Sequence, residues 1–131
     1  MANTVSSRTL CDNAKEAELL IYLASDGASG ELTDQAIVTA SSLNPAASKL
    51  TIEDIEYTFI GFDGFLEFDA TTDVPFAVLA GGVGPSKIKF CRVRGLKDNS
   101  GSGTTGNILL TTSGFSDSGD RGTIKIRVRK D

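Results

Sequence analysis

The stretch Thr123-Ile-Lys-Ile-Arg-Val-Arg129 alternates apolar and basic residues without interruption after its first position. Successive side chains of a β-strand point to opposite faces, so Ile124, Ile126 and Val128 would face a core while the basic residues face solvent. A helix would not keep these three side chains on one face. The C-terminal segment is therefore predicted to be a half-buried strand.

A period close to two also runs through residues 50–62, but its phase changes on the way. The apolar positions are Leu50 and Ile52 on one parity, then Ile55, Tyr57 and Phe59 on the other. The change falls at Glu53-Asp54 and predicts a β-bulge or a bend there. The short Asp63-Gly64 pair that follows predicts a hairpin into the next strand.

Further strands are expected at residues 64–70, 74–79, 87–94 and 107–112, with Pro75 confining its strand to an edge or a strand start. Residues 13–24 fit either a helix or a strand, and we prefer the strand, with residues 36–40 as its partner. Seven to nine short strands separated by turn residues are typical of an all-β antiparallel β-sandwich of jelly-roll type.

The 131 residues suit one domain. We expect an extended N-terminal arm over residues 1–12 and a single β-sandwich over residues 13–131. The N-terminal residues lack the apolar core of a signal peptide, and no apolar run approaches the roughly 20 residues that span a bilayer. These features predict assembly in a cytoplasm, no membrane partner, and cysteines that are reduced and buried.

Several function classes are excluded by composition. The chain has no His, so Ser-His-Asp and Cys-His nucleophilic systems cannot be built. The only cysteines are Cys11 and Cys91, too few for a zinc finger, and whether they approach each other stays open. We therefore predict no metal, no cofactor and no catalytic residue.

One glycine-rich stretch, residues 101–106, matches the Gly-x-Gly-x-x-Gly dinucleotide pattern. That pattern requires a helix immediately after it, whereas a strand is expected here, so a flexible hairpin loop is the better interpretation.

Carboxylates are the remaining candidates for catalysis. Glu53, Asp54 and Glu56 could include an acid and base pair of a glycosidase, but only if they share a concave pocket. The chain has no Trp and only Tyr22 and Tyr57, which argues against a sugar-binding cleft. The Asp117-Ser-Gly-Asp120 stretch is better explained by a turn than by a calcium site.

Charge is distributed unevenly along the chain. Residues 1–86 contain three basic and 13 acidic side chains, a net of −10, and residues 87–131 contain ten basic and four acidic ones, a net of +6; together they give −4. This asymmetry predicts acidic and basic surfaces that meet within the fold or between neighbouring copies.

Candidate interface residues follow from this distribution. The basic candidates are Arg8, Lys87, Lys89, Arg92, Arg94, Lys125, Arg127 and Arg129, with Glu53, Asp54 and Glu56 as acidic counterparts. These basic residues also suggest a nucleic-acid interface, but no aromatic residue interleaves with them for base stacking, so we expect no nucleic-acid partner.

Six stretches carry a resemblance to a known group of proteins. They are Ser25-Asp-Gly27, Leu50-Thr-Ile-Glu-Asp-Ile55, Leu66-Glu-Phe-Asp-Ala-Thr-Thr-Asp73, Gly95-Leu-Lys-Asp98, Thr105-Gly-Asn-Ile-Leu-Leu-Thr-Thr-Ser-Gly114 and Ile124-Lys-Ile-Arg-Val-Arg-Lys-Asp131. Together they resemble the small virion structural proteins encoded by marine tailed bacteriophages, over roughly residues 16–131.

The resemblance implies a particle component with no enzymatic role, located in the virion. A decoration or cement protein on the outside of the capsid fits best, with a neck or tail component as its main competitor. The implied partners are the major capsid protein or other virion proteins, and further copies of the chain, with a trimer as the favoured oligomer. A carbohydrate- or host-surface-binding module carried by the virion is an alternative.

Overall fold

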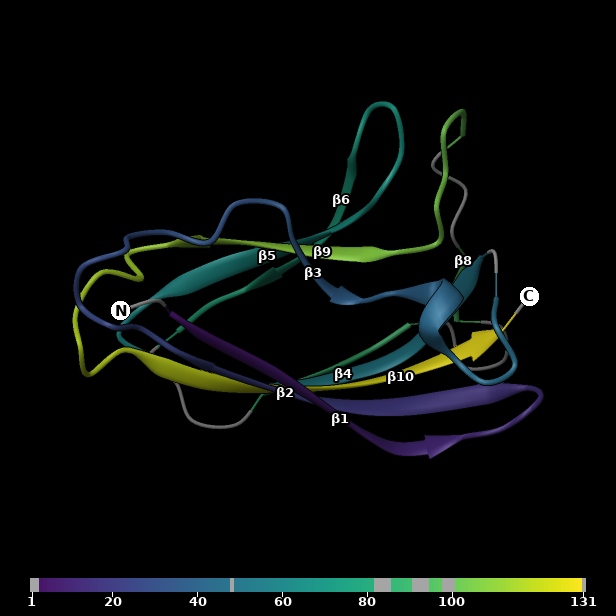
Figure 1. Cartoon of the computed structure of the whole chain (residues 1–131), viewed down its shortest axis with the longest axis horizontal. Helices are drawn as coiled ribbons and strands as arrows, with labels where there is room; N and C mark the ends of the chain where they lie inside the picture. Colours follow the sequence, from purple (N-terminus) through teal and green to yellow (C-terminus); the bar gives the residue numbers. More distant parts are fainter. Residues whose placement is uncertain (1–2, 48, 82–85, 91–94, 98–100, 131) are drawn as a thin grey trace.

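A computed structural model describes residues 3–47, 49–81, 86–90, 95–97 and 101–130 (Figure 1). Two antiparallel sheets lie face to face in it, with the apolar core between them. The elements are β1 (Thr4–Asp12), β2 (Glu16–Ala24), β3 (Gln35–Val38), the 3-10 turn η1 (Ala40–Ser42), β4 (Leu50–Ile60), β5 (Asp63–Phe68), β6 (Val74–Leu79), β7 (Ser86–Lys89), β8 (Leu96–Lys97), β9 (Ile108–Ser113) and β10 (Arg121–Lys130).

The order of the strands is that of a jelly roll. One sheet has the order β1-β2-β10-β4-β7, with β8 also paired to β4, and the other has the order β3-β9-β5-β6. The chain stays in one sheet from β1 to β2, from β5 to β6 and from β7 to β8, and it passes to the opposite sheet at every other connection between successive strands. The described residues thus form nine strands of four or more residues plus the two-residue β8. The predicted all-β sandwich of jelly-roll type is confirmed.

Strand β10 lies in the middle of the six-stranded sheet, between β2 and β4. Its alternation is confirmed, because Ile124, Ile126 and Val128 are fully buried. Burial of each such side chain contributes about 2 kcal/mol, so this strand anchors the sheet to the core.

The predicted bulge lies at Glu53. Arg127 of β10 pairs with Asp54, whereas Val128, the next residue, pairs with Ile52, so that Glu53 has no partner across the ladder. The extra residue reverses the parity of β4, which lets Ile52 and Ile55 both face the core.

Residues 16–24 form strand β2 and not a helix. Alternate side chains of this strand, Ala17, Leu19, Ile21 and Leu23, are buried. The expected pairing with residues 36–40 is wrong, because β2 pairs with β1 and β10 while β3 pairs with β9. The connection between β2 and β3 crosses to the opposite sheet, and turn residues alone do not distinguish a crossover from a hairpin.

The hairpin predicted at Asp63-Gly64 is also wrong. Strands β4 and β5 belong to different sheets, and the chain crosses between them at Gly61-Phe62. Gly61 has a φ of +87°, a conformation that glycine adopts without strain. Phe62 is buried at the crossing, where its ring stacks on Phe59 with centroids 4.4 Å apart.

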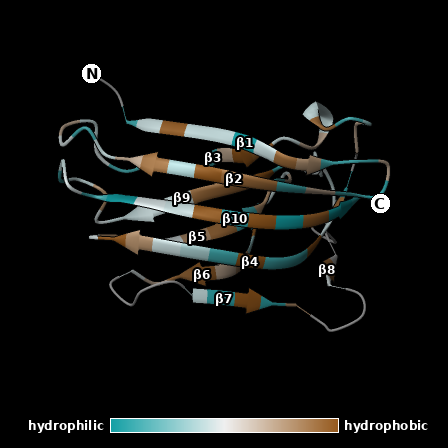
Figure 2. Cartoon of the chain, turned by 90° about the horizontal axis from the view of Figure 1, so that it is seen from below, coloured by the Kyte–Doolittle hydropathy of each residue, from teal (hydrophilic) through white to brown (hydrophobic). Residues whose placement is uncertain are grey.

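The N-terminal segment expected to be an arm contains β1, which pairs along its length with β2 at the edge of the six-stranded sheet (Figure 2). Most side chains of β1 are exposed, including Leu10 and Cys11. The expectation of a buried thiol is therefore wrong for Cys11, because it lies on an edge strand that is poorly covered. Cys91 lies outside the described residues.

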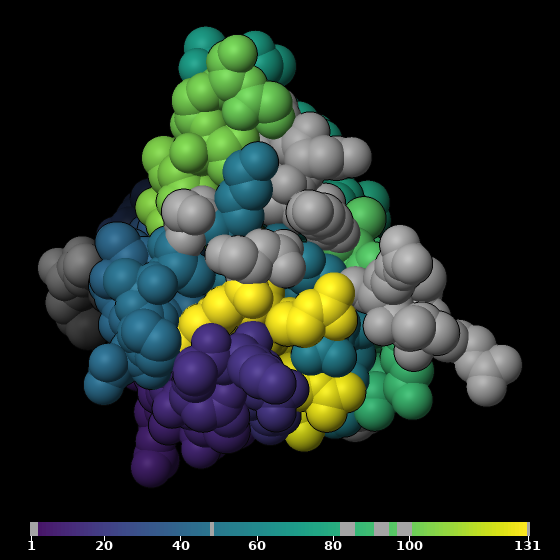
Figure 3. Space-filling view, turned by 90° about the vertical axis from the view of Figure 1, so that its right-hand side faces the viewer, coloured from purple at the N-terminus to yellow at the C-terminus, as the bar shows by residue number. Residues whose placement is uncertain are grey.

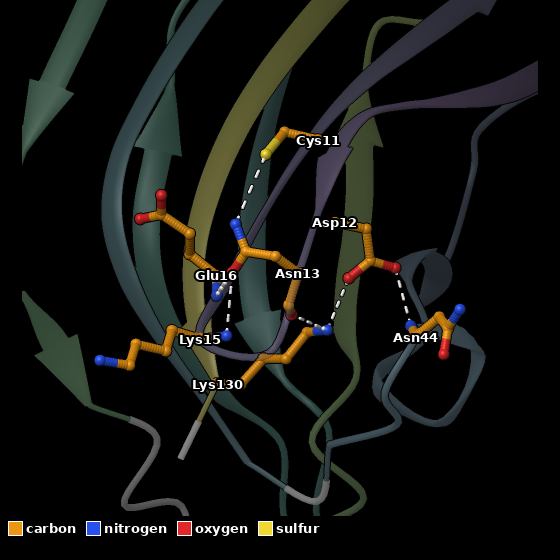
Figure 4. Close-up of polar contacts among 7 residues, drawn as sticks. All are labelled: Cys11, Asp12, Asn13, Lys15, Glu16, Asn44 and Lys130. Atoms are coloured by element: carbon orange, nitrogen blue, oxygen red, sulfur yellow. Dashed lines mark hydrogen bonds and ion pairs between the residues drawn. The ribbon is translucent and has the colours of Figure 1, made fainter.

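The first and last strands are joined by an ion pair (Figure 4). The Lys130 ammonium donates to the Asp12 carboxylate at 2.5 Å and to the Asn13 carbonyl at 2.6 Å. The Lys130 side chain is only 5% exposed. Burial would raise the pKa of Asp12, but hydrogen bonds from Lys130 and the Asn44 backbone N–H lower it below its usual range.

Within the described ranges, the chain has no helix with the length and apolar character needed to span a membrane.

Candidate docking surface

The outer face of the six-stranded sheet brings most of the predicted interface charges together. Arg127 forms an ion pair with Asp54 at 3.0 Å, and Lys125 lies between Glu18 at 4.0 Å and Glu56 at 3.9 Å. In the next strand, Lys87 is in register with Glu56 and Lys89 with Asp54. Acidic and basic rows therefore alternate across this sheet, and part of the charge asymmetry of the sequence is matched inside the fold.

The remaining candidates are placed less centrally. Arg129 is in register with Glu16 and Thr51, Arg8 lies on β1 opposite Leu20, and Glu53 occupies the bulge. Arg92 and Arg94 lie outside the described residues. The charged face is thus a ladder of partly exposed ion pairs, each of which contributes at most about 1 kcal/mol.

The opposite outer face, on the four-stranded sheet, is different. Strands β3, β5, β6 and β9 contain no Lys or Arg. A shallow depression of about 420 Å³ on this face is lined mainly by apolar or small residues: Gly64, Phe65, Pro75 and Val78, with Asp63 and Ser113 at its margin. Exposed apolar surface of this kind, rimmed by polar groups, is typical of interaction sites.

A second hollow, of about 400 Å³, continues from the first. It shares Asp63 and Ser113 with the apolar depression and is otherwise lined by the turn residues Gly61, Phe62, Gly81 and Gly114. The Asp63 carboxylate accepts a hydrogen bond of 2.6 Å from the Gly81 backbone N–H, which holds the margin of both hollows in place.

Three carboxylates gather beside the apolar depression. The oxygen atoms of Asp34, Glu67 and Asp73 lie within 4.8 Å of one another. They come from the residue before β3, from β5, and from the residue before β6. Among the described residues this is the group that could hold a hard cation, since such cations prefer carboxylate oxygens.

Glu67 is the buried member of this group, with 8% of its surface exposed. Burial, and then the neighbouring Asp34 and Asp73 carboxyl groups, raise the pKa of Glu67 to about 7. The Thr111 hydroxyl lies 3.4 Å from both a Glu67 and an Asp34 oxygen, and the Asp34 backbone N–H donates to it at 3.1 Å. The carboxylates are therefore crowded, with Thr111 as the bridging polar group.

The glycine-rich residues 101–106 are not a hairpin loop, because they lead from β8 in one sheet to β9 in the other. They pack against the connection between β5 and β6, and the two segments form a projection (Figures 1 and 3). The Thr105 hydroxyl donates to Asp69 at 2.7 Å, and the Thr71 backbone N–H donates to the Ser102 carbonyl at 3.0 Å. A strand follows the glycines, so the dinucleotide-binding geometry does not occur.

Other sequence-level candidates are placed as follows. Tyr57 is 7% exposed and packs against Phe59 in the core, so it cannot serve as a sugar platform, whereas Tyr22 is exposed. The Asp120 carboxylate accepts hydrogen bonds from the Ser116 and Asp117 backbone N–H groups, as in a plain turn.

Sequence reasoning missed the apolar depression and the carboxylate group. One signal was available: Phe65 and Val78 occupy the parity opposite to the buried Leu66 and Leu79, so both were candidates for exposed apolar positions.

No family model and no curated protein matches the chain. Among solved structures, it is similar to a cupin superfamily protein from Desulfitobacterium hafniense, with 10% sequence identity over 99% of this chain and 80% of that one and a TM-score of 0.34.

Proposed function

We propose that this protein is a non-enzymatic virion structural protein, a decoration or cement protein that binds the outside of a phage head and stabilises it. The observation that carries the proposal is the exposed apolar depression with its carboxylate margin on the four-stranded sheet. This surface would contact the major capsid protein or another virion protein. The protein would assemble in the host cytoplasm and remain in the virion.

The arrangement of the two faces supports a docking role more than a catalytic one. Asp54, a candidate for acid–base chemistry, is engaged by Arg127, and Glu53 is the unpaired residue of a bulge. The carboxylates that do lie close together, around Glu67, adjoin a shallow apolar surface. Apolar area gives affinity and charge at its margin gives orientation, which is the combination that a specific contact between proteins needs.

The fold supplies rigidity for this role. Both sheets share one core, so the four-stranded face is held in a fixed shape. A cement protein also contacts copies of itself, and a trimer is the oligomer we propose, with no contribution from membrane or nucleic acid.

The proposal is tested by adding the purified protein to heads that lack it. We expect saturable binding and a rise in the temperature at which the heads open, while sedimentation shows an oligomer. Absence of binding, or binding without any gain in thermal stability of the heads, would overturn the cement role. Binding confined to necks or tails would move the protein to the competing class of virion components.

A further inference from the structure

The apolar depression and the carboxylate group form one continuous surface. Phe65 is in register with Thr111 on one side and with Val78 on the other, and Glu67, two residues along β5, is in register with Leu109 and Pro75. Residues two apart on a strand share a face, so Phe65 and Glu67 are neighbours on the outside of the sheet. Pro75 borders both parts.

The carboxylates on this surface have no cation opposite them from their own sheet. The ion pairs found among the described residues join β10 to β2, β4 or β1, all in the six-stranded sheet. Lys125 and Arg127 on the six-stranded face already have carboxylate partners, so a charged partner would have to displace these pairs there. On the four-stranded face, a partner's cation meets no competitor from the same strands.

We infer that this surface receives a segment of the partner protein in which an apolar side chain stands next to an arginine or a lysine. The apolar side chain enters the depression against Phe65 and Val78, and the cation lies on Asp34, Glu67 and Asp73. This inference rests on the proposed function for the source of the segment, but its chemistry is set by the surface itself.

Charge complementarity decides between this partner and others. An acidic or a purely apolar segment would leave three carboxylates crowded and partly desolvated at the contact, which is costly. A cation would relieve their mutual repulsion. Glu67 faces Asp34 from the β3 side, Asp73 from the β6 side and Thr111 from β9, and no basic group of these strands shares the site. Burial, and then the neighbouring carboxyl groups, raise the pKa of Glu67, so docking of a cation beside it should release a proton near neutral pH.

The test measures binding to heads that lack the protein, with two variants of Val78 and one control variant on the opposite face. Val78→Lys places a cation where the partner's apolar group would sit, Val78→Ile keeps the apolar contact, and Lys125→Ser alters the opposite face. We expect Val78→Lys to weaken binding about tenfold or more, with Val78→Ile and Lys125→Ser binding like the wild type.

The carboxylate group is tested separately with the double variant Asp34→Asn and Asp73→Asn. Asn tolerates the positive φ of +49° at position 34 and keeps the acceptor oxygen that Asp73 offers to the Ala70 backbone N–H. We expect weaker binding and a shallower dependence on salt than in the wild type. An unchanged salt dependence would overturn the cationic part of the inference.

The outcomes separate the inference from the proposed function. If the wild type binds heads and Val78→Lys binds equally well, the inference is overturned and the cement role stands. If the wild type does not bind heads, the cement role is overturned, and the surface is then tested with two synthetic dipeptides, acetyl-leucyl-arginine amide and acetyl-leucyl-glutamate amide. Chemical-shift changes at Val78 and Thr111 with the arginine peptide alone would support the inference; equal changes with both, or none, would refute it.

Discussion

Val78 on β6 is in register with Phe65 on β5, and the two side chains lie on the outside of the four-stranded sheet. Val78 is 74% exposed, the most exposed of the large apolar residues among those the structure describes. Their neighbours Leu66 and Leu79 are fully buried on the other side of the same strands. The sheet therefore presents apolar side chains on both faces, which a strand serving only the core does not need.

Val78 should contribute little to folding. Replacing it by Ser is expected to change the free energy of unfolding by less than about 0.5 kcal/mol, because little of its surface is removed from water. Leu66→Ala, on the buried side, should cost about 2–5 kcal/mol. Urea unfolding followed by circular dichroism measures both, and a cost for Val78→Ser similar to that of Leu66→Ala would mean that Val78 serves the core.

The ion pair between Arg127 and Asp54 should be worth about 1 kcal/mol or less, because the Arg127 side chain is 45% exposed. A double-mutant cycle with Arg127→Ala and Asp54→Ala gives the coupling free energy directly.

We expect the triple change of Lys125, Arg127 and Arg129 to Ser to leave binding to heads intact at physiological salt. Loss of binding in that variant, with folding preserved, would make the six-stranded face the docking surface.

The partly buried pair of Lys130 and Asp12 should matter more. Lys130→Met removes the ammonium from a site where the side chains of Lys130 and Asp12 are 5% and 16% exposed, and we expect a loss of about 2–3 kcal/mol. Adding Asp12→Asn to Lys130→Met should recover part of that loss, since it removes the unpaired charge. If the single variant unfolds at the same urea concentration as the wild type, the pair does not hold the two terminal strands together.

Glu67 should make stability fall as the pH rises. Its folded-state pKa of about 7 lies above the value of 4.5 for an unperturbed glutamate, so the folded protein binds more protons than the unfolded chain between these values. The contribution is therefore fully present below about pH 4.5 and is lost as the pH rises through about 7.

Glu67→Gln removes this titration and provides the matched control. Between pH 5 and pH 8, the unfolding free energy of the wild type should fall relative to that of Glu67→Gln. Asp12 has a lowered pKa and loses its contribution only as the pH falls toward strongly acidic values, so it does not overlap this range. Parallel pH profiles for the two proteins would show that Glu67 has an ordinary pKa.

The strands could be predicted where burial is one-sided. Ile124, Ile126 and Val128 alternate with basic residues because β10 has core on one face and water on the other, and the bulge at Glu53 was visible as a change of parity. The crossings between sheets could not be predicted, since a turn such as the one at Gly61 has the same residue types whether it closes a hairpin or changes sheets.

The docking surface was hidden for a related reason. Alternation shows which side of a strand is exposed only where the two sides differ in polarity. In β5 and β6 apolar residues occupy both parities, so the pattern alone does not show which of them are exposed. Asp34, Glu67 and Asp73 come from three segments and become neighbours only through the pairing of β9, β5 and β6. The charge asymmetry is visible in the sequence, but only the pairing of β10 with β4 shows that Arg127 contacts Asp54 within one sheet.

Imaging the intact particle at a resolution that places side chains tests the central claim most directly. The account predicts copies of this protein on the outside of the head, with Val78 and Phe65 against a capsid subunit and an arginine or lysine of that subunit at Glu67. Copies found in a neck or tail ring, or bound to the head through the six-stranded face, would contradict it.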